Sequence, residues 1–148
     1  MPKKEPLYPH VPRSKKPQYP HETSVTMDIP DQRIQDLLTS ALEGGSNYWY
    51  IIKKYNYPPG QTKQSLGIEF PHIELPFKGG SLLIGDREAE KGDTTYDKIL
   101  DRAAINQGMK LMAEKYPKHY ADFLSENDDA ATGDVFLQLA LFGEVVFG

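Results

Sequence analysis

The residues of this 148-residue chain best suited to chemistry are polar side chains set among rings and apolar residues. Asn47 precedes three consecutive aromatic residues at 48–50, while Arg102 and Asn106 interrupt an apolar helical pattern. Aromatic faces stack on purines, an amide reads a base edge, and a guanidinium pairs with phosphate. The pattern therefore predicts a small nucleotide-like ligand. The residues predicted to bind it are Asn47, Tyr48, Trp49, Arg87, Arg102, Asn106 and Phe142.

A purely structural explanation of such residues stays open at this point. Buried polar side chains need hydrogen-bond partners, and the backbone supplies partners as well as a ligand does. The same two interpretations apply to Gln107 and to the polar residues that interrupt the apolar run at 135–148, Gln138 and Glu144.

Catalytic and metal sites are not indicated. The chain has no cysteine, and its four histidines share no helix or strand spacing that would suit a metal. The acidic loop that begins at Asp86 is not a calcium loop, because Lys91 and Asp97 stand where glycine and glutamate are needed. Phosphate-loop and nucleophile-elbow patterns are absent as well. We therefore expect no catalytic residue, no bound metal and no cofactor.

Composition indicates a soluble globular protein, with 39% apolar and 26% charged residues. No apolar run approaches the roughly 18 residues of a membrane span, and the start lacks the apolar core of a secretory signal. We therefore expect a cytoplasmic protein with no membrane contact. Residues 25–148 carry a net charge of −7, which argues against duplex nucleic acid as a partner.

Residues 1–24 differ from the rest of the chain. They hold six of the twelve prolines and a net charge of +3, which predicts an extended, basic N-terminal arm. Two interpretations of this arm stay open: a mobile tail, or a segment whose aromatic and histidine side chains dock on a partner subunit. Residues 25–148 are expected to form one domain for ligand binding and oligomerisation.

The first part of that domain has clear periodic signals. Alternation at 25–29 predicts a short strand. Apolar residues at helical spacing over 34–42 predict a helix, with Asp31 as its N-cap. Gly44 and Gly45 are expected to end this helix, one of them in the left-handed conformation.

Strand patterns follow. The aromatic and β-branched stretch at 47–55 predicts a strand that ends in a turn. Residues 66–77 predict an edge strand or a bulge, because Pro71 and Pro76 do not fit a central strand. The apolar stretch 79–86 predicts another short strand.

The remainder is predicted to be helical. One helix is expected over 95–116, where Gly108 would allow another backbone to come close. A second begins at Pro117, and a third, capped by Thr132 or Asp134, contains the terminal apolar run. The expected fold is a single α+β domain: a small, mostly antiparallel sheet with two to four packed helices.

Three blocks of the sequence resemble small phage and prophage proteins. They are ALEGGSNYWY at 41–50, the stretch from INQGMK to TGD at 105–134, and GDVFLQLALFGEVVFG at 133–148. The pairing of the first block with the last resembles phage anti-defence proteins typified by the Thoeris anti-defence protein 1 family. The proline-rich arm and the loop around Pro58 lie outside the resemblance.

The resemblance implies a sponge that sequesters a nucleotide-derived immune signal, of the cyclic ADP-ribose or cyclic oligonucleotide type, without cleaving it. It implies a homo-oligomer built from dimers that acts in the host cytoplasm. We expect stacking by Tyr48, Trp49 or Phe142, base or ribose contacts from Asn47 and Asn106, and phosphate pairing by Arg102 or Arg87. The alternative is an inhibitor that binds a host protein directly, and a hydrolase of the same ligands is a third possibility.

Overall fold

The computed structural model describes residues 23–148, so all but two residues of the predicted arm lie outside the described residues. The described chain combines five α-helices with a three-stranded antiparallel sheet in the order β1-β2-β3, which confirms the expected α+β class. The elements are α1 (Asp31–Ser40), the π-helical turn η1 (Ala41–Gly45), β1 (Tyr50–Asn56), α2 (Pro71–Glu74), the 3-10 turn η2 (Leu75–Phe77), β2 (Ser81–Asp86), β3 (Lys98–Leu100), α3 (Arg102–Lys115), α4 (Pro117–Leu124) and α5 (Ala130–Phe142).

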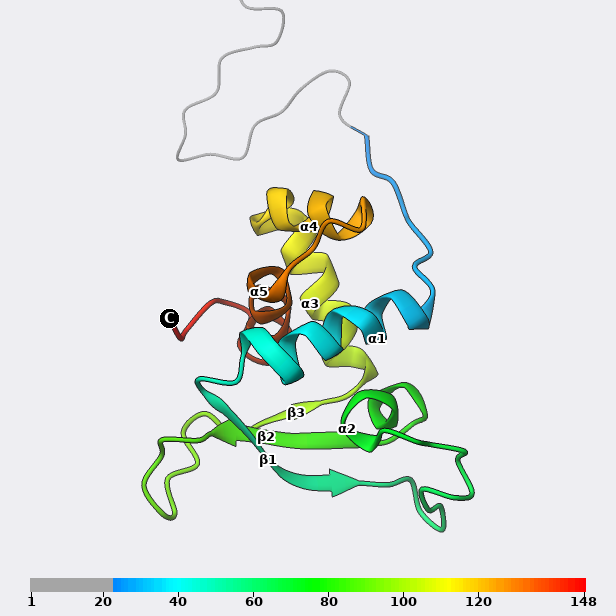
Figure 1. The fold of residues 1–148 in the computed structure, drawn as a ribbon, viewed down its shortest axis with the longest axis vertical. Coiled ribbons are helices and arrows are strands. Elements are labelled where there is room, and N and C mark those ends of the chain that lie inside the picture. The colour runs from blue at the N-terminus through cyan, green and yellow to red at the C-terminus, as the bar shows by residue number, and fades with distance from the viewer. Residues whose placement is uncertain (1–22) are drawn as a thin grey trace, which may run out of the picture.

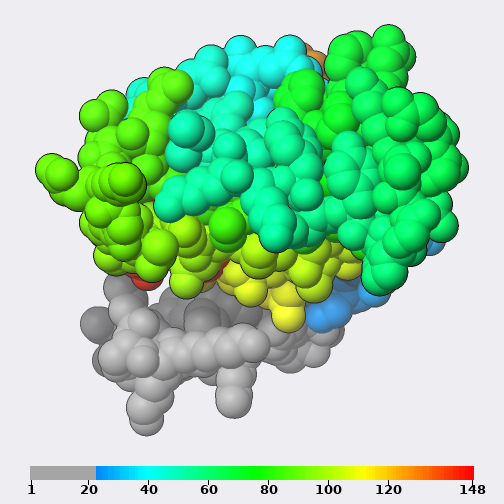
Figure 2. Space-filling model, turned by 90° about the horizontal axis from the view of Figure 1, so that it is seen from below, coloured from blue at the N-terminus to red at the C-terminus, as the bar shows by residue number. Residues whose placement is uncertain are grey.

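The elements form two layers (Figure 1). The sheet is one layer, and α1, α3, α4 and α5 are stacked over one of its faces, with α5 in the middle of the helices. Figure 2 looks at the molecule from the sheet side, where β1 and the loops that flank it form the surface. The sheet is antiparallel throughout, with Ile52 opposite Ile84 and Leu83 opposite Ile99.

The core lies between the two layers. Leu82 and Ile84 of β2 and Leu100 of β3 are fully buried on the sheet face that meets the helices. They join one apolar cluster with residues such as Leu37 of α1 and Phe136 of α5. Removing each such side chain from water stabilises the fold by about 1.5–3 kcal/mol.

Helix α5 is the buried terminal helix that the sequence predicts. It packs against α1, η1, α3 and α4, and every residue from Phe136 to Leu141 is buried. Its N-cap is Asp129, whose carboxylate accepts from the backbone N–H of Thr132 at 3.0 Å. The predicted caps Thr132 and Asp134 are therefore wrong, because an acceptor earlier in the chain begins the helix. Gly143, in the left-handed conformation (φ 75°), ends it.

The glycine prediction at Gly108 is confirmed, and the one at Gly44 and Gly45 is confirmed only in part. Gly108 does allow a close approach, since a Cβ there would lie 2.8 Å from Ala140 Cβ and 3.0 Å from the Ala140 backbone. Gly44 and Gly45 do end the first helix, but neither is in the left-handed conformation. They belong to η1, and Gly45 is instead pressed against α5.

The strand expected at 25–29 is not formed. These residues are extended beside α3 and α4 without a ladder partner, and Val25 is 80% exposed. Alternation alone does not supply a neighbouring strand. Asp31 is not the N-cap of α1 either: Pro30 holds that position, and Asp31 is the first helical residue.

The edge strand expected over 66–77 is also wrong. Pro71 starts the short helix α2 and Pro76 lies in η2, because proline suits the first turn of a helix as well as a strand edge. The Glu74 carboxylate accepts from the backbone N–H groups of Glu69 and Phe70, at 2.9 and 2.6 Å, and so caps this turn.

Two predicted boundaries, the start of the helix expected from Thr95 and the start of the strand expected from Asn47, differ from those in the structure. Residues expected at the start of a helix from Thr95 form β3 instead, and α3 begins at Arg102. Asp101 decides this boundary, because its carboxylate accepts from Ala104 N at 2.9 Å as an N-cap. Strand β1 begins only at Tyr50, so Tyr48 and Trp49 lie in a turn and not on a strand.

Candidate functional site

The first and last sequence blocks pack directly against each other, through η1 and α5. A Cβ at Gly45 would lie 1.9 Å from the carbonyl oxygen of Ala130, and one at Gly133 would lie 2.7 Å from Ala41 N. Both positions therefore require glycine, since any side chain would separate the two backbones. These glycines bring the turn at 46–49 over the first turns of α5.

Asp134 is the centre of the contact. Its Oδ1 accepts from the hydroxyl of Ser46 and from the indole Nε1 of Trp49, both at 2.8 Å. Its Oδ2 accepts from the hydroxyl of Tyr48 at 2.7 Å and from Nε2 of Gln138 at 3.1 Å. One carboxylate thus accepts from four donors, among them the buried Ser46 hydroxyl and Trp49 indole N–H of this turn.

Gln138 holds the segment that follows α5. Its side chain is fully buried, and its Oε1 accepts from the backbone N–H groups of Val146 and Phe147, each at 2.7 Å. Its Nε2 donates to the carbonyl oxygen of Phe147 at 3.2 Å. The amide thus pairs with the backbone as a neighbouring strand would, and it fixes the position of the Phe147 ring.

That ring stacks on Trp49. The two centroids are 4.7 Å apart and the planes differ by 6°, while Phe142 lies against the indole at 5.6 Å. Trp49 is only 1% exposed, so its indole has no face open to a ligand in this structure. The Phe142 ring, expected to stack on a ligand, contacts Trp49, Phe147 and Tyr96.

Tyr48 keeps an exposed ring but has its hydroxyl engaged. Burial of the hydroxyl, followed by its hydrogen bond to the Asp134 carboxylate, raises the pKa of Tyr48 to about 12. Burial and the neighbouring carboxylate each disfavour the ionised, phenolate form of Tyr48. Tyr48 is therefore a neutral donor at physiological pH.

Asn47 and Arg87 are brought together on the surface. The Arg87 guanidinium donates to the carbonyl oxygen of Asn47, and the Arg87 backbone N–H donates to Trp49 O at 2.7 Å. With Tyr50, Ile51 and Ile52 they line a hollow of about 210 Å³. This hollow is small for a nucleotide, because ligand pockets usually measure about 300–1,000 Å³.

Arg102 is committed to another protein group. Its two terminal nitrogens donate to the Asp31 carboxylate at 3.1 and 3.0 Å, and one of them also donates to Phe77 O at 3.0 Å. The hydrogen bond from Arg102 lowers the pKa of Asp31. Arg102 thus joins α1, η2 and α3, which is the structural explanation that the sequence left open. Gln107 likewise donates to the backbone, at Leu139 O and Ala140 O.

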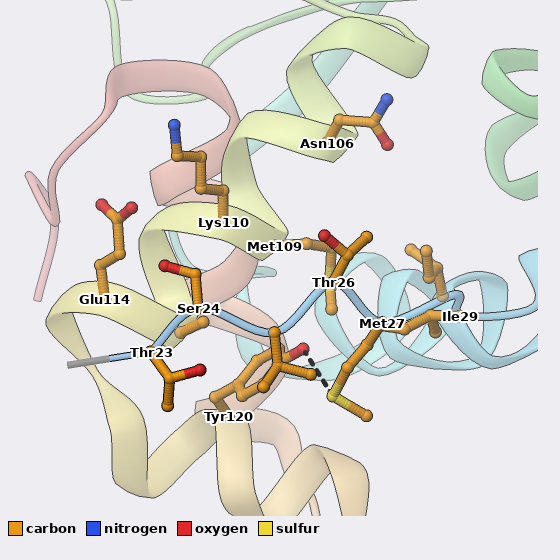
Figure 3. Close-up of a pocket in the computed structure, with 13 residues that line it drawn as sticks. Thr23, Ser24, Thr26, Met27, Ile29, Asn106, Met109, Lys110, Glu114 and Tyr120 are labelled. Atoms are coloured by element: carbon orange, nitrogen blue, oxygen red, sulfur yellow. Dashed lines mark hydrogen bonds between the residues drawn. The ribbon is translucent and has the colours of Figure 1, made fainter. Parts of the chain in front are cut away.

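Asn106 is the predicted residue that lies in a cleft of nucleotide size. This N-terminal cleft, of about 910 Å³, lies between residues 23–29 and helices α3 and α4. Figure 3 shows Asn106, Lys110 and Glu114 in a row on α3, along one side of the extended segment, and Tyr120 on the other side. The lining residues are Thr23, Ser24, Val25, Thr26, Met27, Ile29, Ile34, Asn106, Met109, Lys110, Ala113, Glu114 and Tyr120.

The N-terminal cleft combines an apolar floor with a few polar groups. Met109 and Ile34 are buried beneath it, and the Tyr120 hydroxyl contacts the Met27 sulfur at 3.9 Å. Lys110 and Glu114 are the two charged residues of the lining, one of each sign. Lys110 was missed in the sequence, although its spacing of four residues from Asn106 places both on one helix face.

Residues 23–148 contain no cluster of three or more metal-ligating side chains. None of their helices is both long and apolar enough to cross a membrane.

Comparisons with family models, with curated proteins and with solved structures find no match to this chain.

Proposed function

We propose that this protein binds a small nucleotide-derived signal in the N-terminal cleft and holds it without cleaving it. The observation that carries the proposal is the cleft itself, whose volume of about 910 Å³ suits a ligand of nucleotide size. In this proposal the chain is a phage anti-defence protein of the host cytoplasm, as the resemblance of its sequence blocks implies.

The cleft offers a partner for each part of such a ligand. Lys110 supplies the cation for a phosphate group, and Asn106 supplies an amide for a base edge or a ribose hydroxyl. The Tyr120 ring and Met109 provide an apolar surface for the base. Glu114 opposes negative charge, so the proposed ligand carries few phosphates relative to its size.

The proposed site shares only part of the set of ligand-binding residues predicted from the sequence. Of the residues expected to bind the ligand, Asn106 stays in it, whereas Trp49, Phe142 and Arg102 have their contacts within the protein. Asn47 and Arg87 line the smaller hollow and are kept as a secondary contact. The resemblance also implies a homo-oligomer built from dimers, which we retain as part of the proposal.

A direct test follows the fate of the ligand. The protein is incubated with cyclic ADP-ribose or with a cyclic dinucleotide, separated from free ligand, and heat-denatured, and the released compound is identified by mass spectrometry. Release of the intact compound supports sequestration. Release of an altered compound would mean a hydrolase, and absence of retention for every compound would contradict the proposal.

An inhibitor of a host protein is the second candidate. It is favoured by apolar residues on the sheet face that the helices leave uncovered, where Ile51 and Ile99 are each 44% exposed. Under this alternative the protein retains no nucleotide, and charge substitutions at Lys110 do not change inhibition of the host protein. Substitution of Ile51 and Ile99 by threonine would then abolish inhibition of the host protein.

A further inference from the structure

A second groove, on the opposite side of α1 from the N-terminal cleft, is strongly acidic. It lies between α1 and the turn at 69–74 and measures about 430 Å³. We call it the acidic groove, and its lining residues are Gln32, Gln35, Asp36, Thr39, Glu43, Glu69, Phe70, Ile73 and Glu74. Four of the nine are carboxylates, and none is a lysine or arginine.

The carboxylates of the acidic groove are used unequally. Glu74 caps the turn at 69–70, and Glu43 contacts the His72 ring at 2.9 Å. Within residues 23–148, the Asp36 carboxylate accepts only from the Gln32 side chain, at 2.9 Å, and neither Asp36 nor Glu69 forms a salt bridge. Negative charge therefore remains available in the groove.

The acidic groove also presents an aromatic surface. Phe70 is 53% exposed, a high fraction for a large apolar residue, and its ring is nearly perpendicular to the His72 ring, with the two centroids 6.3 Å apart. Grooves with exposed aromatic rings bind proline-rich segments, whose extended backbone needs little further ordering. Carboxylates beside such a ring favour a segment that is also basic.

We propose that residues 1–22 of the same chain bind in this acidic groove. The segment carries Lys3, Lys4, Arg13, Lys15 and Lys16 against Glu5 and Glu22, so its charge complements that of the groove. It contains six prolines, and the tripeptide Tyr-Pro-His occurs twice, at 8–10 and 19–21. Each repeat offers a ring and a proline to Phe70.

The segment is long enough to reach the groove. Twenty-two residues in a polyproline conformation span about 68 Å. A domain of 126 residues has a radius of gyration of about 14 Å, so the segment exceeds the diameter of its own domain. Binding within one chain benefits from a millimolar effective concentration, which makes a weak contact sufficient.

The test uses the full chain and its lack of cysteine. A nitroxide is attached to Gln18→Cys, a unique thiol, and peak heights of backbone amides are compared before and after reduction of the label. We expect loss of most of the peak height at Glu69, Phe70 and Ile73. Unchanged heights at these three residues would overturn the proposal.

Two controls separate charge recognition from chance proximity. Neutralising the groove by Asp36→Asn with Glu69→Gln should restore the peak heights, and the unchanged positions of the other peaks report that the fold is intact. The matched pair Glu88→Gln with Glu90→Gln, in the loop after β2, should leave the broadening as it is. Equal effects of both pairs would contradict specific docking.

A mixed sample identifies the source of the segment. Isotope-labelled chain without nitroxide is combined with unlabelled chain that carries it. Absence of broadening at Phe70 supports binding within one chain, whereas broadening there would assign the groove to a second copy and overturn the proposal as stated.

Discussion

The indole Nε1 of Trp49 donates to Oδ1 of Asp134 at 2.8 Å, across 85 positions of the sequence. This bond joins the segment at 41–50 to the segment at 133–148, the first and last of the three sequence blocks distinguished above. Because the same carboxylate also accepts from Ser46, Tyr48 and Gln138, the blocks form one structural unit. Packing and hydrogen bonding within the chain therefore account for the contact between the two blocks without a ligand.

Asp134 should be the most sensitive polar residue of this unit. Asp134→Ala removes the acceptor of four donors, and we expect the free energy of unfolding to fall by about 2–4 kcal/mol. Urea unfolding followed by fluorescence of Trp49, the one tryptophan, measures it. Asp36→Ala, at an exposed position, is the matched control and should change stability by less than about 0.5 kcal/mol. Equal stability of the two variants would contradict the role of Asp134.

The adjacent glycines of η1 should respond in opposite ways. Gly45→Ala places a methyl group 1.9 Å from the Ala130 carbonyl oxygen and should destabilise the protein by about 1–3 kcal/mol or more. At Gly44 the nearest atom, Ala130 Cβ, would be 3.8 Å away, so Gly44→Ala should be neutral or stabilise by about 0.4–1 kcal/mol. Thermal unfolding of both variants checks the pair, and a Gly45→Ala protein as stable as wild type would disprove the close helix contact.

Phe147 should shield Trp49 from solvent. Phe147→Ala uncovers one face of the indole, so acrylamide should quench Trp49 fluorescence more strongly and the emission should shift to the red. The loss of stability should be about 1–2 kcal/mol, less than for a fully buried phenylalanine. Phe70→Ala removes a ring that contacts His72 and not the indole, so it should leave the quenching unchanged. Quenching of the Phe147→Ala variant at the wild-type level would mean that another group covers Trp49.

The raised pKa of Tyr48 predicts a loss of stability at alkaline pH. Between the ordinary value of 10 and about 12, the unfolded chain releases the phenol proton while the folded chain keeps it. Stability therefore falls as pH rises through this window, by less than about 1.4 kcal/mol per pH unit because the ring is half exposed. Below pH 10 both states bind the proton, and the stability gained from the shift is fully present.

Substitution isolates the contribution of Tyr48 from those of the other tyrosines. Tyr48→Phe should show a shallower decline of unfolding free energy between pH 10 and 12 than wild type. Absorbance titration of the phenolates should lose its most alkaline component in this variant. An identical pH profile for both proteins would place the Tyr48 pKa at its ordinary value.

Much of the fold could be predicted where one local signal acts alone. Helix α5 and the close approach at Gly108 follow from apolar density and from a glycine within a helical pattern. The segment 66–77 and the residues that form β3 were misassigned because proline suits two structures and because a three-residue strand exists only through its partner β2.

The site was harder to predict than the fold. Trp49 and Phe142 have aromatic rings that could stack on a ligand, but Phe147 covers the indole instead. Phe147 lies there because its backbone N–H donates to the Gln138 side chain, a contact that the sequence pattern does not reveal. Arg102 has the side chain of a phosphate ligand but meets Asp31, 71 positions away. The N-terminal cleft needs residues 23–29 to lie along α3, and no periodic signal encodes that placement.

The affinity of charge variants for cyclic ADP-ribose, measured by calorimetry, tests the proposal that a nucleotide-derived ligand binds in the N-terminal cleft. Lys110→Met should weaken binding by roughly tenfold or more, because a charge-assisted hydrogen bond contributes about 1.5–3 kcal/mol. Glu114→Gln should strengthen binding, and Lys118→Met, on the exposed face of α4, should not change it. Equal affinity of wild type and all three variants would contradict binding in this cleft.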